Sequence, residues 1–285
     1  MSEAVGNSRF GLHILRDAPS NARRPIDVVA VHGLNGHPFE TWTQAGKGDS
    51  TLWLKDLLHT KLPGVRVMTF GYDATVLGNT SEQNVRANAG SLLAELRNRR
   101  EGDDGGDEDS DEGDHVGLNG RPIVFVAHSL GGIVVKQALT LANKKKAYKD
   151  IADSTKGIIF FGTPHKGADA ATWARQISDI VQVALHRPPA SFLETLERHS
   201  PDLLKISEDF RVFAPRYAIT SFYEQHATKV LGTVVVGKMS AVLHLPNEEA
   251  TMMGGDHREM CRFGKADPRF DQVWRAIRRS SRGVC

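Results

Sequence analysis

Short runs of almost purely apolar residues, separated by segments with helical patterns, constrain the fold of this chain more than any other feature. Such runs are typical of strands buried on both faces, because strands with one solvated face alternate between apolar and polar residues. The runs lie at residues 26–31, 65–70, 123–127, 157–161, 217–221 and, less regularly, 239–245. The helical segments lie at residues 80–99, 131–142 and 268–279. Together they predict an α/β fold with a mostly parallel, doubly wound sheet.

A single domain over residues 8–280 accounts for this pattern, and one segment within it stands apart. Residues 172–212 lie between two predicted strands, look helical around a proline pair and are too long for a simple connection. We interpret them as an inserted helical cap above the sheet. Their apolar residues, Ile177, Val181 and Leu196 among them, predict an apolar pocket under the cap. The alternative is that these residues only pack onto the domain.

A second segment, residues 101–115, is an acidic insertion. Its first 14 residues hold nine acids and no base, so we interpret it as a disordered surface loop, with shielding of the basic body as the alternative. The net charge of the chain is +2, but the other 25 acids face 36 bases, which leaves the rest of the chain near +11. A basic body attracts anionic surfaces, so a membrane surface is a candidate partner. Nucleic acid is not expected, because the bases are scattered and no aromatic residues interleave them.

The sequence lacks signals for secretion, membrane crossing or cofactor binding. The first 16 residues contain no apolar core of a signal peptide, and no apolar run approaches the roughly 18 residues of a membrane span. Two cysteines, Cys261 and Cys285, are too few for a disulfide framework. We therefore expect a cytoplasmic protein. Neither a metal-binding motif nor a phosphate-binding GxxxxGKS/T loop occurs, so we predict no metal and no cofactor.

The segment AHSLGG, residues 127–132, carries the most specific chemistry in the chain. It lies where a predicted buried strand turns directly into a helix, and a small-x-Ser-x-Gly turn in this place is typical of a nucleophile elbow. Ala127 replaces the usual first glycine and is still small. The serine, Ser129, needs a base to attack a carbonyl at neutral pH, and that base needs an orienting acid. An ordinary serine helix cap is the alternative.

The acid and the base are expected after the serine, in that order, each in a loop beyond a later strand. Glu224 lies just past the predicted strand at residues 217–221, and we predict it as the acid. The rival acids are Asp169, Asp179 and Asp256. His257 lies in the turn-rich segment GGDH before the last helix, and we predict it as the base. The rival histidines are His165, His226 and His244, none of which fits the expected order and placement.

An ester hydrolase also needs an oxyanion hole. Attack on the carbonyl creates a negative oxygen, which fixed N–H donors stabilise by roughly 3–4 kcal/mol each. One donor is expected to be the backbone N–H of Leu130, directly after Ser129. The other is expected from the loop HGLNG at residues 32–36, and we predict the backbone N–H of Leu34. A plain turn that ends the strand is the alternative reading of this loop.

Four segments resemble one lipase-like α/β-hydrolase family: IDVVAVHGLNGHPFETW (26–42), VFVAHSLGGIVVKQAL (124–139), FFGTPHKGAD (160–169) and DHREMCRF (256–263). That family includes the serine-active-site-containing proteins and, more distantly, GPI inositol-deacylases. It is similar to the hydrolase domain at the N-terminus of fungal NLR-like STAND receptors. The resemblance covers nearly the whole chain.

The resemblance implies an α/β-hydrolase fold with Ser129 as nucleophile, Glu224 as acid and His257 as base. Around them we expect these pocket-shaping residues: Gly33, His128, Gly131, Thr163 and His165. The predicted function is a serine hydrolase that cleaves carboxylic esters of lipids or other apolar acyl groups through an acyl-enzyme. The alternative is an effector or signalling domain of an NLR-like receptor whose main role is partner interaction. The sequence does not determine the acyl chain or the head group of the substrate. It also leaves open whether the cleaved bond is an ester or an amide, and what the oligomeric state is.

Overall fold

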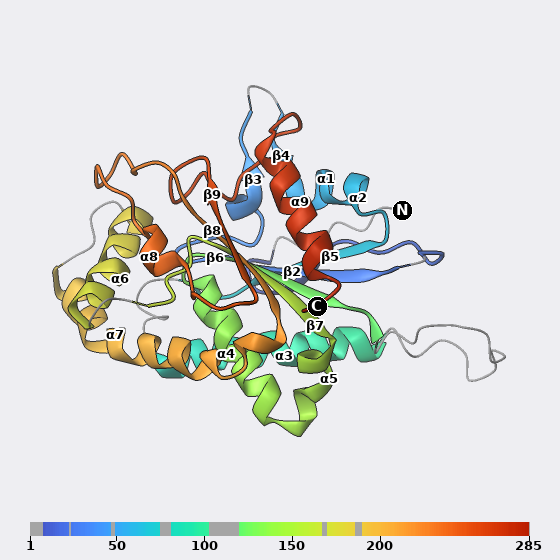
Figure 1. The fold of residues 1–285 in the computed structure, drawn as a ribbon, viewed down its shortest axis with the longest axis horizontal. Helices are drawn as coiled ribbons and strands as arrows, with labels where there is room; N and C mark the ends of the chain where they lie inside the picture. Colours follow the sequence, from blue (N-terminus) through green and yellow to red (C-terminus); the bar gives the residue numbers. More distant parts are fainter. Residues whose placement is uncertain are drawn as a thin grey trace.

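A seven-stranded sheet forms the centre of the protein, in the order β1-β5-β2-β6-β7-β8-β9 (Figure 1). The computed structural model describes residues 8–22, 24–46, 49–74, 81–102, 120–166, 170–185 and 190–284. The strands are β1 (Gly11–Arg16), β2 (Ile26–Val31), β5 (Val65–Gly71), β6 (Ile123–His128), β7 (Thr155–Phe161), β8 (Ala218–Glu224) and β9 (Glu248–Met253). Neighbouring strands are parallel, apart from β1, which is antiparallel to β5. The predicted α/β fold with a mostly parallel sheet is confirmed.

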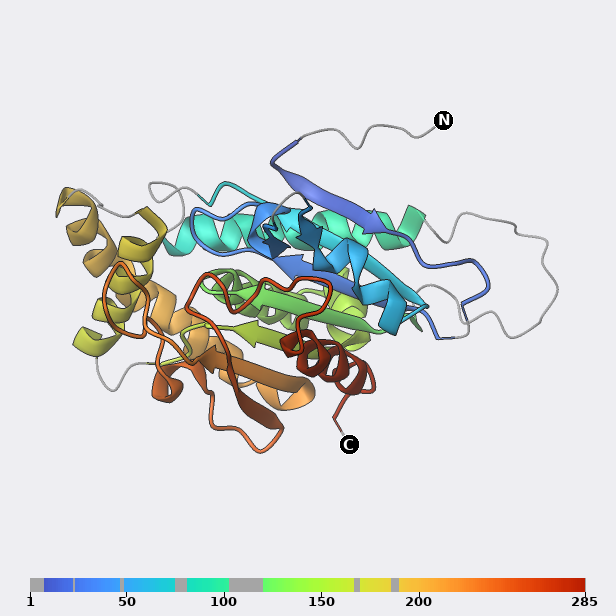
Figure 2. The same cartoon turned by 90° about the horizontal axis from the view of Figure 1, so that it is seen from above.

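Helices cover both faces of this sheet, as Figure 1 and Figure 2 show from two directions. α3 (Glu82–Gly102) and α4 (Gly131–Lys144) lie on one face, and α9 (Arg269–Ser280) lies on the other. Successive residues of β2 enter the two cores in turn: Val29 joins the cluster with α3 and α4, and Val28 joins the cluster with α9. Apart from Asp27, which forms ion pairs with three arginines, the strand is apolar because both of its faces are buried.

Short elements complete the connections. They are η1 (Glu40–Trp42), β3 (Thr43–Gln44), β4 (Thr51–Leu52), α1 (Trp53–Asp56), α2 (Leu58–Lys61), η3 (Lys146–Tyr148), α5 (Lys149–Ser154), η4 (Ala214–Arg216) and α8 (Lys238–Ala241). Within the described ranges, we find no helix with both the length and the apolar character that crossing a membrane requires.

The two edge strands differ from the sequence prediction. β1 is missing from the predicted strands, because its half-exposed residues form no continuous apolar run. The strand predicted at residues 239–245 is wrong: α8 takes its first half, the rest is irregular, and β9 follows it in the chain. Leu243 is buried there without pairing in the sheet, and its N–H donates to the carboxylate of Glu248. The apolar residues of this segment therefore reflect packing against the core and not pairing in the sheet. The sequence pattern alone cannot distinguish a buried strand from a buried irregular segment.

The segment predicted as a cap, residues 172–212, contains most of α6 (Ala170–Leu185) and α7 (Ala190–Arg211). α6 packs against α7, and α7 packs against α4, beyond the carboxyl ends of the strands (Figure 1). The proline pair falls outside the described residues, as does the acidic insertion after its first two positions. The indole N–H of Trp173 in α6 donates to the carbonyl of Ser200 in α7 at 2.7 Å, which joins the two helices.

Candidate active site

Ser129 stands on a sharp turn between β6 and α4. Its backbone φ is +53°, a left-handed value that a non-glycine residue rarely adopts. Glycines make room for this turn, since a Cβ on Gly131 would lie 2.2 Å from the carbonyl oxygen of His32. A Cβ on Gly132 would lie 2.3 Å from the side chain of Thr163. The sequence therefore folds into the strand-turn-helix arrangement of a nucleophile elbow, with a small residue wherever another segment comes close.

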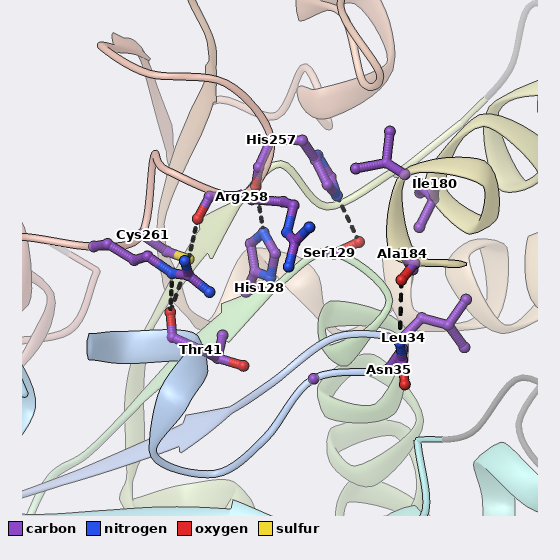
Figure 3. A pocket seen from close by; sticks show the side chains of 13 residues that line it. Leu34, Asn35, Thr41, His128, Ser129, Ile180, Ala184, His257, Arg258 and Cys261 are labelled. Atoms are coloured by element: carbon purple, nitrogen blue, oxygen red, sulfur yellow. Dashed lines mark hydrogen bonds between the residues drawn. The ribbon is translucent and has the colours of Figure 1, made fainter. Parts of the chain in front are cut away.

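The three residues predicted to act together lie in one hydrogen-bonded row. His257 Nε2 is 2.8 Å from Ser129 Oγ, and His257 Nδ1 is 2.6 Å from Glu224 Oε1 (Figure 3 shows the first of these bonds). All three side chains are buried. An ionised carboxylate only accepts hydrogen bonds, so Nδ1 carries the imidazole proton and Nε2 accepts the serine O–H. This is the order of contacts that activates a serine hydroxyl.

Glu224 is the last residue of β8, and the loop that follows holds its carboxylate. The N–H groups of Val235 and Val236 donate to Oε2 and Oε1 at 2.9 and 3.0 Å. These donors compensate the burial of the charge and fix the oxygen that faces His257. The sequence analysis missed both valines, because a backbone N–H leaves no signature in a side-chain pattern.

The rival acids and histidines lie elsewhere. Asp256 accepts the backbone N–H groups of Arg258 and Glu259, which shapes the turn that carries His257. Asp179 lies on α6, where burial raises its pKa, and Asp169 is outside the described residues. His226 and His244 are exposed.

His165 is buried against the ring of Phe160, with 4.7 Å between the ring centroids. Neither of its ring nitrogens has a hydrogen-bond partner among the described residues, and burial lowers its pKa well below the usual value. It does not line the cleft beside Ser129.

Two further predicted residues, His128 and Thr163, hold the main chain of His257 and Ser129 in place. His128 Nε2 lies 2.7 Å from the carbonyl oxygen of His257, so its N–H holds the histidine loop against the elbow. Burial, with the nearby His257, lowers the pKa of His128 to about 3, which keeps this ring neutral. Thr163 Oγ1 donates to the carbonyl of Ser129 at 3.0 Å. Of the five predicted pocket-shaping residues, His128 alone lines the cleft; Gly33, Gly131 and Thr163 instead pack around the turn.

The loop at residues 32–36 stands opposite Ser129. The hydroxyl of Tyr72 donates to the carbonyl of His32 at 2.7 Å, and the N–H of Asn35 donates to the carbonyl of Ala74 at 2.7 Å. The backbone N–H groups of Leu34 and Leu130 donate no hydrogen bond to any described residue. Two N–H groups without a partner beside a serine hydroxyl are what an oxyanion hole requires.

A cleft of about 80 Å³ opens beside Ser129 and His257 (Figure 3). Its other lining residues come from the 32–36 loop, η1, the elbow, α6 and the turn after His257: Leu34, Asn35, Gly36, Thr41, His128, Ile180, Val183, Ala184, Arg258, Cys261 and Arg262. Asn35 Nδ2 donates to the carbonyl of Ala184 at 3.0 Å, which ties α6 to the loop across the cleft. Cap residues Ile177 and Val181, predicted to face a pocket, are instead fully buried in the core.

No group of three or more His, Cys, Asp or Glu side chains within the described ranges could hold a metal ion. The absence of metal and cofactor stays a prediction.

Comparisons with known proteins identify the family of the chain. Residues 27–174, just over half of the chain, match the family described as "Putative serine esterase (DUF676)". Protein SERAC1 from Bos taurus is 27% identical over 268 residues, which are 85% of this chain and 36% of that protein. Protein SERAC1 from Danio rerio is 28% identical over 283 residues, which are 90% of this chain and 39% of that protein. The chain thus spans well under half of the length of these relatives.

Solved structures share the fold. The mature lipase BlEst2 from Bacillus licheniformis superposes with a TM-score of 0.57 at 18% identity and covers 94% of this chain and 99% of its own. The RedJ thioesterase from Streptomyces coelicolor superposes with a TM-score of 0.50 at 12% identity, over 92% of this chain and 93% of its own. Relations to GPI inositol-deacylases and to NLR-like receptors stay predictions. The chain has the α/β-hydrolase fold, its enzyme class is that of a carboxylic ester hydrolase, and it belongs to the serine esterase family DUF676.

Proposed function

We propose that this protein hydrolyses carboxylic esters through Ser129, His257 and Glu224, by way of an acyl-enzyme. The observation that carries the proposal is the continuous row of hydrogen bonds, 2.8 and 2.6 Å long, from the serine hydroxyl to the buried carboxylate. The left-handed turn at Ser129 supports it independently, because such strain persists only where the surrounding structure enforces it.

In the first step, Ser129 Oγ attacks the ester carbonyl carbon while its proton passes to His257 Nε2. Glu224 accepts the Nδ1–H and stabilises the imidazolium that forms. The backbone N–H groups of Leu34 and Leu130, which donate to no described residue, receive the negative carbonyl oxygen in this proposal. The tetrahedral intermediate then collapses, and the alcohol leaves with the proton from Nε2.

In the second step, a water molecule takes the place of the alcohol. His257 Nε2 removes a proton from this water, whose oxygen attacks the acyl carbon on Ser129 Oγ. Collapse of the second intermediate releases the carboxylic acid and returns the proton to Ser129. The same two N–H groups stabilise both intermediates.

The substrate side of the proposal is an apolar acyl group. Leu34, Ile180 and Val183 give one wall of the cleft an aliphatic surface. A cleft of about 80 Å³ is small beside the roughly 300–1,000 Å³ of common ligand sites. We therefore propose that α6 shifts away from the 32–36 loop when a longer acyl chain enters.

The test is covalent labelling of the purified protein with a fluorophosphonate, followed by identification of the modified peptide. Wild-type protein should be labelled at Ser129, and Ser129→Ala should lose both the label and about 10⁶-fold in kcat on a butanoyl phenyl ester. Ser281→Ala, at the far end of α9, serves as the matched control and should label normally. Undiminished labelling of Ser129→Ala would reject the proposed nucleophile.

A further inference from the structure

The cleft beside Ser129 has two unlike walls. Leu34, Ile180 and Val183 supply its aliphatic part, and Arg258 and Arg262 supply its charged part. Figure 3 shows Arg258 on the other side of Ser129 from Leu34 and Ile180. Among the described residues, no aspartate or glutamate lines the cleft. Within the described part of the chain, neither arginine forms an ion pair, although many of the other arginines do. A small cleft with two positive charges and no compensating acid is built to receive a negative charge.

The turn after His257 places both arginines. Asp256 Oδ1 accepts the N–H of Arg258 at 2.9 Å, so the main chain is held while the side chain stays unpaired. Figure 3 shows this side chain directed into the cleft, between His128 and Ser129. Arg262 Nε donates to the carbonyl of Thr41 at 3.4 Å, and its terminal amino groups bond to no described residue. Two guanidinium groups thus keep donors for a partner that is not part of the chain.

The chemistry decides which end of the substrate meets these groups. The leaving alcohol must receive its proton from His257 Nε2, so it lies on the histidine side of the cleft. Arg258 is the next residue in the chain and lines that side, whereas the aliphatic residues of α6 and the 32–36 loop are left for the acyl group.

From this arrangement we infer that the preferred substrate is an ester whose alcohol portion carries an anionic group, phosphate or carboxylate, held by Arg258 and Arg262. The inference rests on the proposed serine hydrolase function and names its substrate class. A guanidinium binds both anions through paired N–H donors, so phosphate and carboxylate share the same recognition chemistry.

A set of matched soluble substrates tests the charge preference without a lipid interface. The probes are butanoyl esters of para-hydroxybenzoate, of its methyl ester and of para-hydroxyphenyl-trimethylammonium, which carry one negative, no and one positive charge on the leaving group. The wild-type protein should favour the anionic ester in kcat/KM, after correction for the alkaline hydrolysis rate of each probe. That preference should shrink as salt rises from 0.02 to 0.5 M, because screening weakens exposed charge pairs. The butanoyl ester of glycerol phosphate, compared with that of glycerol, extends the test to phosphate.

Variants assign the preference to the two arginines. Arg258→Gln and Arg262→Gln should each lower the ratio of anionic to neutral kcat/KM about fivefold, the effect of losing one partly exposed ion pair. Arg258→Glu should invert the preference in favour of the cationic ester, and Arg258→Lys should retain most of it. Arg278→Gln, an exposed arginine on α9, is the matched control and should leave the ratio unchanged.

The outcomes separate this inference from the proposed function. Hydrolysis of all three esters at corrected rates that are equal, or an unchanged ratio in both glutamine variants, overturns the anionic substrate class and leaves the hydrolase proposal in place. Failure of the wild-type protein to hydrolyse any ester, together with no fluorophosphonate label on Ser129, rejects the proposed function itself. Thermal melting of each variant checks that it is folded before its ratio is interpreted.

Discussion

At the scale of single residues, the proposed triad depends on how one buried carboxylate is held. Glu224 accepts three hydrogen bonds, two from the loop after β8 and one from His257. The two backbone donors fix the carboxylate whether or not His257 is present, so the acid orients the imidazole and not the reverse. Substitution at Glu224 should therefore act on the base more than on substrate binding.

Glu224→Gln should lower kcat about 10⁴-fold with little change in KM. The amide lacks the charge that stabilises the imidazolium, and its NH₂ group can turn toward Nδ1 and favour the wrong tautomer of His257. Asp256→Asn is the control, because its amide oxygen can still accept the two N–H groups of the turn. Steady-state kinetics on a butanoyl phenyl ester measure both variants. A larger loss in Asp256→Asn would mean that the proposed acid is the wrong residue.

The same scale shows what the sequence could predict about the site. Ser129 sits in a local motif, and chain order with strand ends was enough to select Glu224 and His257, which the fold brings into contact. Arg258 and Asn35 carried no such signal, since an arginine after a histidine and an asparagine in a turn are common on any surface. Only the fold brings both of them into the lining of the cleft.

At the scale of elements, α6 divides its residues between the core and the cleft. All four of Ile177, Ile180, Val181 and Val183 are buried in one core cluster, but only Ile180 and Val183 also line the cleft. The two residues of each pair lie about one helical turn apart, so each pair occupies one face of α6. Because both faces are apolar, the sequence alone could not tell which one meets the substrate. The side chain of Leu196 lies outside the described residues. The pocket-facing role predicted for Ile177 and Val181 therefore passes to their neighbours.

We expect Ile180→Ser and Val183→Ser to lower kcat/KM for octanoyl esters more than for acetyl esters. Each buried acyl CH₂ is worth about 0.8 kcal/mol, so even the loss of contact with two of them gives roughly a tenfold difference between the substrates. All three variants should lower the melting temperature, because each buries an unpaired hydroxyl. Ile177→Ser should leave the ratio between the two esters unchanged, because Ile177 does not line the cleft. Equal losses on both esters would show that α6 does not select the acyl group.

At the scale of the whole molecule, the predictable part of the fold was its centre. The central strands β2, β5, β6 and β7 are buried on both faces and therefore carry uninterrupted apolar runs. The edges were not predictable, because β9 is mostly exposed and reads EEATMM. Lys136 shows the same limit inside the core: it is fully buried, and its Nζ donates to Pro164 and Ser207, yet a lysine in a helix normally indicates a solvated face.

The whole molecule also contains neutral histidines in its interior, which makes its stability depend on pH. Burial lowers the pKa of His32 to about 4 and, with the nearby His257, lowers that of His128 to about 3, from the usual value of 6.5. In the unfolded chain both rings regain the ordinary pKa. The unfolded state therefore binds more protons than the folded state below about pH 6.5. The stability from these two rings is fully present above that pH and is lost as the pH falls toward their folded pKa values.

We predict that the free energy of unfolding falls by about 4 kcal/mol between pH 7.5 and pH 5 through these two histidines, since each loses roughly 1.4 kcal/mol per pH unit below 6.5. That is a large fraction of the roughly 5–15 kcal/mol that stabilises a typical domain. Urea unfolding followed by circular dichroism measures the loss.

His32→Phe can keep the stacking on Tyr72, and His128→Gln can keep a donor for the carbonyl of His257, while neither side chain takes up a proton. Each variant should be less stable than the wild type at pH 7.5 but should lose about 2 kcal/mol less on acidification. His226→Gln, at an exposed position, should change neither value. A wild-type acid loss that persists unchanged in the double variant would place the titrating groups elsewhere in the molecule.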